Sequence, residues 1–132
     1  MDGLTLARQI GTIYLQGGQS GATKCGDAAN SGTVRGGPGD DTITLVGGEP
    51  RLSTCNGTAT GVANGMDAAD EELAGKVYGG LGNDKITLTG GLNSDSGNQA
   101  PSNDEEGFVN AGLGNDTCVF TPASIGEVVN CT

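Results

Sequence analysis

The chain has 132 residues, of which 26 are glycine and none is histidine, and its 16 acidic and 6 basic side chains give a formal net charge of -10. This composition excludes histidine-based catalysis within the chain and makes nucleic acid and anionic membrane surfaces poor partners. No apolar run approaches the ~18 residues of a membrane span, so no membrane insertion is expected. The length fits a single domain over residues 1–132.

Three segments of the chain align with one another without gaps. They are TVRGGPGDDTITLVGG from Thr33, KVYGGLGNDKITLTGG from Lys76 and FVNAGLGNDTCVFTPA from Phe108. A partial copy precedes them, because TIYLQGG from Thr12 matches TITLVGG from Thr42. Such self-similarity is typical of solenoids, in which each repeat buries its apolar face against its neighbour. We therefore expect about four stacked coils.

Each coil is expected to hold a return strand, a tight glycine turn, a second strand and an excursion. Alternation of apolar residues predicts second strands whose inward pairs are Ile13 and Leu15, Ile43 and Leu45, Ile86 and Leu88, and Cys118 and Phe120. The return strands contribute Val34, Val77, Val109 and Val128. The expected fold is all-β, a parallel β-helix or β-solenoid, with loop insertions near residues 16–33, 46–76 and 89–108 on one side.

The tight turns near residues 36–41, 79–84 and 111–116 share the pattern GGxGxDxUx, in which U is apolar. Glycine permits the positive φ angles of a sharp turn that exposes carbonyl oxygens, and the aspartate adds charge. Calcium prefers six to eight oxygen ligands. One turn has too few oxygens, but two turns stacked ~4.8 Å apart could enclose an ion. The alternative is a tight turn with no bound cation.

These segments resemble the calcium-binding nonapeptide repeats of the RTX, or haemolysin-type, family. The resemblance implies that calcium is bound by the carboxylates of Asp41, Asp84 and Asp116 and by backbone carbonyls of Gly36, Gly37, Pro38, Gly39, Gly79, Gly80, Leu81, Gly82, Ala111, Gly112, Leu113 and Gly114. The family places two motifs in each coil, whereas this chain places one, so a single row of ions is expected. Three stacked turns give two complete sites. A third ion requires something stacked above the turn at Asp116.

The four cysteines allow three pairings, and the repeat register favours one of them. Cys25 and Cys55 fall at the same position in consecutive coils, so stacking brings their Cα atoms within disulfide range. Cys118 and Cys131 belong to one coil and are expected to form the second disulfide. The alternatives are a buried thiol at Cys118 and, at Cys131, a thiol that bonds another chain. Disulfides and calcium both indicate an extracellular location.

Strands are expected at both ends of the chain, at Leu4–Leu6 and Glu127–Asn130, with no capping helix at either end. This favours a secreted calcium-binding structural subunit that stacks head to tail, with the Cys118 coil meeting the Leu4–Leu15 coil of the next copy, in an extracellular filament or surface assembly. The alternative is a calcium-dependent RTX-like folding module of a larger secreted enzyme, toxin or adhesin.

Three further possibilities have weaker support. Outward threonines such as Thr42 and Thr44 allow ice binding, although Tyr14 interrupts the row. The acidic clusters at residues 67–72 and 103–106 could form a second cation site, but a solvated acidic face is favoured. No serine or cysteine has a base in a recognisable motif, and the carboxylates have simpler explanations, so we expect no enzyme activity.

Overall fold

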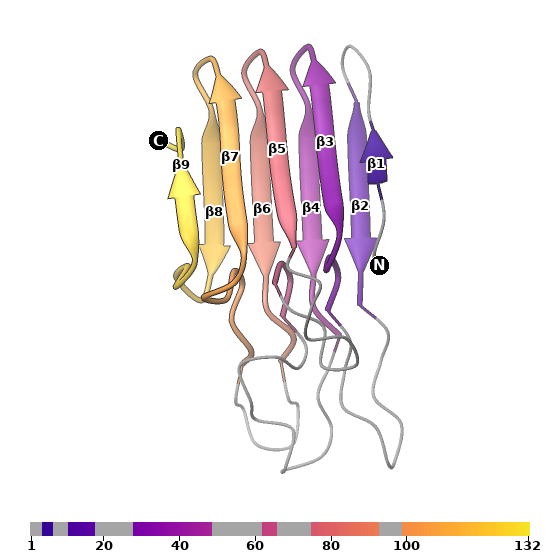
Figure 1. Ribbon diagram of the computed structural model, residues 1–132, viewed down its shortest axis with the longest axis vertical. Coiled ribbons are helices and arrows are strands. Elements are labelled where there is room, and N and C mark those ends of the chain that lie inside the picture. The colour runs from indigo at the N-terminus through magenta and orange to yellow at the C-terminus, as the bar shows by residue number, and fades with distance from the viewer. Residues whose placement is uncertain (1–3, 7–10, 18–27, 49–61, 66–74, 93–98) are drawn as a thin grey trace.

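The computed structural model describes residues 4–6, 11–17, 28–48, 62–65, 75–92 and 99–132. Within these residues the chain is all-β, contains no helix and forms two parallel sheets (Figure 1). One sheet consists of β1 (Leu4–Leu6), β3 (Thr33–Pro38), β5 (Lys76–Leu81), β7 (Phe108–Leu113) and β9 (Glu127–Val129). The other consists of β2 (Thr12–Gln16), β4 (Thr42–Val46), β6 (Lys85–Thr89) and β8 (Thr117–Thr121).

The chain alternates between the two sheets, so each strand pairs with the strand two places away in the sequence. The order is β1-β3-β5-β7-β9 in one sheet and β2-β4-β6-β8 in the other. We call an odd-numbered strand, its tight turn and the following even-numbered strand a pass. In Figure 1 the tight turns that join β3 to β4, β5 to β6 and β7 to β8 lie together at the upper end of the sheets. Each pass therefore adds one strand to each sheet.

The core lies between the sheets and consists of ladders of like residues. Ile43 pairs with Ile13 and Ile86, and Ile86 pairs with Cys118. A second ladder in the sheet of even-numbered strands consists of Leu15, Leu45, Leu88 and Phe120. The ladder in the sheet of odd-numbered strands consists of Val34, Val77, Val109 and Val128. Nearly all these side chains are buried, with those of β8 and β9 partly buried against the cluster. The predicted register of both strand sets is confirmed.

A fourth ladder, which the repeat alignment does not predict, crosses the expected insertions. Asn30, Asn64 and Asn103 lie one above another through isolated parallel bridges, and all three are buried. The Asn30 side-chain amide donates to Asn64 Oδ1, and that of Asn64 donates to Asn103 Oδ1, both at 2.8 Å. Asn64 Nδ2 also donates to the carbonyls of Gly75 and Phe108. The segments that connect one pass to the next are thus tied to one another at one residue each.

The Cys118–Cys131 disulfide is confirmed, with Cα atoms 5.5 Å apart. The expected Cys25–Cys55 pair and the acidic cluster at residues 67–72 lie outside the described residues. In the other acidic cluster, residues 103–106, Asp104 is buried and its Oδ1 accepts the Glu106 N–H. The described residues contain no helix long and apolar enough to cross a membrane.

Candidate metal centre

The three tight turns need glycine at two positions for conformational reasons. We name residues 36–41, 79–84 and 111–116 the first, second and third turns. Their second position has φ of 110°, 122° and 102° at Gly37, Gly80 and Gly112. The fourth position also has positive φ in every turn, at Gly39, Gly82 and Gly114. Residues with a Cβ rarely adopt these angles, so the repeated glycines are a requirement of the backbone.

The first position of the first and second turns is restricted by the neighbouring turn rather than by φ. A Cβ added to Gly36 would lie 2.5 Å from the Gly79 carbonyl oxygen and 2.6 Å from Asp41 Oδ2. A Cβ added to Gly79 would lie 2.2 Å from the Ala111 carbonyl oxygen and 2.5 Å from Asp84 Oδ2. Each of these glycines therefore leaves room for a carboxylate of its own turn and a carbonyl of the next.

The three turn aspartates form a buried ladder. Asp41, Asp84 and Asp116 are each at most 2 % exposed. Asp41 Oδ1 accepts the Gly11 N–H at 2.9 Å, Asp84 Oδ1 accepts the Asp41 N–H at 2.8 Å, and Asp116 Oδ1 accepts the Asp84 N–H at 2.8 Å. One oxygen of each carboxylate is therefore used to hold successive passes in register.

The other carboxylate oxygen of each aspartate is buried and has no hydrogen-bond partner. A buried polar atom without a partner is costly, and a carboxylate oxygen is more costly than a neutral one. Asp41 Oδ2 and the Gly79 carbonyl oxygen both lie within 2.6 Å of one point, so they are no more than about 5 Å apart. The same holds for Asp84 Oδ2 and the Ala111 carbonyl oxygen. This upper bound is compatible with two oxygens that share one cation at ligand distances of about 2.5 Å.

The electrostatics of the ladder also favour a positive charge. Burial raises the pKa of Asp84, and the neighbouring carboxylates of Asp116, Asp41 and Asp40 raise it further, against the opposing hydrogen bond from the Asp41 backbone. Burial and the like charges both act against the charged form of Asp84, and a counter-charge would offset them. A cation beside Oδ2 would supply that counter-charge.

A second polar row runs along the outside of the turns. Asp40 Oδ1 accepts the Asn83 N–H at 2.8 Å, and Asn83 Oδ1 accepts the Asn115 N–H at 2.9 Å. All three residues are exposed. The fifth position of the motif, which is Asp in the first turn and Asn in the other two, therefore supplies an acceptor side chain that ties adjacent turns together. The repeat alignment shows this Asp and Asn position but does not by itself predict that role.

Among the predicted ligands, only the three aspartates are brought together through their side chains. The three aspartates stack, whereas the side chains of Pro38, Leu81 and Leu113 are exposed on the turn surface. Only the backbone of those residues could serve as a ligand. Over the described ranges, no group of three or more His, Cys, Asp or Glu side chains is arranged to hold a metal ion. A cation here would therefore depend on one carboxylate per turn and on backbone carbonyls.

Comparison with known proteins gives no further constraint, because no protein-family model, no curated protein and no solved structure matches the chain. The resemblance to RTX repeats that the sequence suggests rests on the three turn motifs alone, and none of these comparisons tests it.

Proposed function

We propose that the chain is an extracellular calcium-binding β-solenoid, a structural protein whose turns are held together by a single row of calcium ions. The observation that carries this proposal is the ladder of Asp41, Asp84 and Asp116, in which each buried Oδ2 lacks a partner. Calcium fits this donor set because in proteins it binds carboxylate and carbonyl oxygens at about 2.3–2.6 Å in flexible geometry. When bound, the ion would neutralise the buried charge and join adjacent turns.

The topology and the motifs support the same conclusion. Strictly alternating parallel strands with constant register are what a chain wound as a solenoid of about four coils produces. The glycine and aspartate positions match the RTX pattern that the sequence suggested. The Cys118–Cys131 disulfide is compatible with an oxidising, extracellular environment.

The direct test is calcium titration of the chain and of two isosteric variants. Asp84→Asn keeps an oxygen that can accept the Asp41 N–H but removes the charge beside the Ala111 carbonyl. Asp40→Asn removes the same charge at an exposed site where the other turns already carry Asn83 and Asn115. By isothermal titration calorimetry we expect Asp40→Asn to bind as many ions as the parent and Asp84→Asn to lose one of them. Equal binding by both variants, or no binding by the parent, would rule out the proposed site.

End-to-end association is a second proposal, favoured by the edges of the sheets. In the described part of the chain β2 pairs only with β4, and β8 pairs only with β6, so each has one backbone edge without a strand partner. Such edges are templates for pairing with another copy, and a contact of this type propagates into a fibre. Sedimentation velocity of the calcium-loaded chain should show species that grow with concentration. A monodisperse monomer at high concentration would favour the alternative, a folding module within a larger secreted protein.

A further inference from the structure

The last pass, which begins with β9, departs from the earlier ones. From Asn110 in β7 to Thr117 in β8 the chain goes through the whole third turn. Val129 pairs with Asn110, and only three positions later the Thr132 N–H donates to the Asp116 carbonyl at 3.3 Å. The corresponding bonds in earlier passes are those of Lys85 N–H to Asp41 and Thr117 N–H to Asp84, both 2.8 Å. The segment of residues 130–132, which we call the strap, thus crosses between the sheets without a turn.

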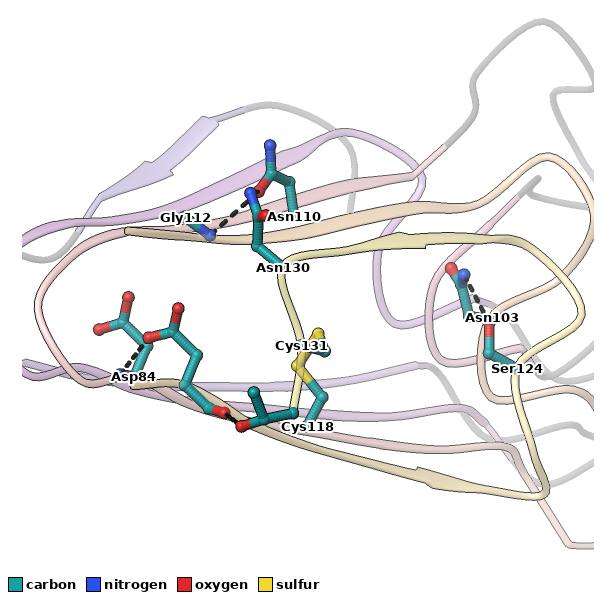
Figure 2. Close-up of a disulfide and its surroundings, with 10 residues drawn as sticks. Asp84, Asn103, Asn110, Gly112, Cys118, Ser124, Asn130 and Cys131 are labelled. Carbon is teal, nitrogen blue, oxygen red and sulfur yellow. Dashed lines mark hydrogen bonds between the residues drawn. A yellow bond between two sulfur atoms is a disulfide. The ribbon is translucent and has the colours of Figure 1, made fainter. Parts of the chain in front are cut away.

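The strap places Cys131 at the register position of the turn aspartates. Because Thr132 occupies the place of Lys85 and Thr117, the residue before it occupies the place of Asp84 and Asp116. Cys131 is bonded to Cys118, which lies in β8 directly after Thr117 (Figure 2). The Thr132 hydroxyl also donates to the Asp116 carbonyl. A covalent bond therefore joins the last pass to the one before it at the corner where the inner passes stack carboxylates.

The asparagine ladder ends in a similar way. Asn103 Nδ2 donates to Ser124 Oγ at 3.0 Å (Figure 2). The Ser124 hydroxyl donates in turn to the Gly126 carbonyl. Ser124 accordingly takes the place that a fourth asparagine would occupy. The Ser124 hydroxyl accepts the bond from Asn103 and donates its own proton to the Gly126 carbonyl. Ser124 therefore has no second N–H or O–H with which to continue the ladder.

The third turn differs from the other two at the position that faces the strap. Its first position is Ala111, whereas the first and second turns have Gly36 and Gly79 there. A methyl group at either glycine would collide with a carbonyl of the next turn at 2.5 Å or less. Ala111 is buried and packs in the core cluster together with Cys131. A methyl group fits at this position because the strap, not another turn, lies above it.

We propose that residues 122–132 form a built-in end cap in which the Cys118–Cys131 disulfide stands where the inner passes hold a cation. The two cation positions are those between the first and second turns and between the second and third turns. Among the described residues the strap, and not another glycine turn, lies above the third turn, so we assign two ions to the row and not three. The statement about ions rests on the proposed function, whereas the cap itself does not, because it follows from register, disulfide and hydrogen bonds.

The test compares the parent with the double variant Cys118→Ser, Cys131→Ser, which leaves Cys25 and Cys55 unchanged. Hydrogen exchange is followed by mass spectrometry in excess chelator and in saturating calcium. In chelator the parent should protect β8 and residues 127–132 at least about tenfold more than β5 and β6, and the double variant should lose that protection. In calcium both proteins should bind two ions.

Two results would overturn the cap. One is equal exchange of β8 in the parent and the double variant in chelator. The other, which needs only the parent, is exchange of its own last pass as fast as that of its inner passes. A third calcium ion bound by the parent would overturn the assignment of the disulfide to the cation's place. If neither protein binds calcium, the proposed function fails, while the exchange comparison still decides whether the cap exists.

Discussion

The asparagine ladder provides the sharpest test of how the passes are held together. Asn64 is fully buried, and its amide nitrogen donates to three oxygens, those of Gly75, Asn103 and Phe108. Asn64→Asp keeps the size of the side chain but points an oxygen at those three acceptors. Two N–H groups shared among three acceptors, at a net ~0.5–1.5 kcal/mol per hydrogen bond, together with the repulsion and burial of a carboxylate, predict a loss of at least about 3 kcal/mol in the free energy of unfolding.

The matched control is Asn83→Asp, which makes the same atomic change and adds the same charge. Asn83 is exposed and occupies the register of Asp40, so an aspartate fits there and should cost no more than about 1 kcal/mol. Urea denaturation followed by circular dichroism measures both values, with the m-value as a check on two-state unfolding. If Asn64→Asp lies within 1 kcal/mol of Asn83→Asp, the buried ladder does not carry the stability assigned to it.

Three further predictions concern the turns and the cap. Gly79→Ala should lower the calcium stoichiometry by one and the melting temperature by several degrees, because its methyl group would fill the space between Asp84 Oδ2 and the Ala111 carbonyl. A calcium titration that gives the same stoichiometry as the parent would contradict this. Calcium at about 100 times its Kd should raise the free energy of unfolding by ~2.7 kcal/mol for each independent site, measured by denaturation with and without chelator, and an absent shift would count against the ions. Ser124→Ala should lower the free energy of unfolding by about 0.5–1.5 kcal/mol through loss of the hydrogen bond from Asn103. A loss larger than that of Asn64→Asp would contradict the view that the buried middle of the ladder contributes more than its end.

The sequence predicted the strands and their register well because the repeats fix both at once. Once Ile13, Ile43 and Ile86 are aligned, a period of two places the apolar residues on one face, and stacking sets the pairing. The same alignment placed Asp41, Asp84 and Asp116 in one column, and the structure stacks them there. What alignment could not show is that each carboxylate uses one oxygen for the neighbouring backbone and leaves the other without a partner.

The asparagine ladder escaped prediction because its members keep no constant spacing. Asn30 precedes β3 closely, whereas a long insertion separates Asn64 from β5, so a gap-free alignment does not superimpose them. The only local signal is the small residue before each, namely Ala29, Ala63 and Ser102. Hydrogen bonds between side chains in successive layers depend on where insertions return to the stack, which is a property of the whole fold and not of any one segment.

If copies of this chain assemble end to end, the proposed end cap limits what calcium can control in the assembly. At the β8 end the strap and disulfide already occupy the corner above the third turn, so no turn of a second copy can stack there to share an ion with Asp116. Contact with another copy at this end must then use the backbone edge of β8 and the partly buried Phe120 rather than a bridging cation. Calcium would govern folding of the inner passes within each chain, while association at this end would depend on calcium only through that folding. A chelator added after assembly should therefore loosen β3 to β6 before it separates the copies, and release of monomers that are still folded would show instead that the junction itself contains the ion.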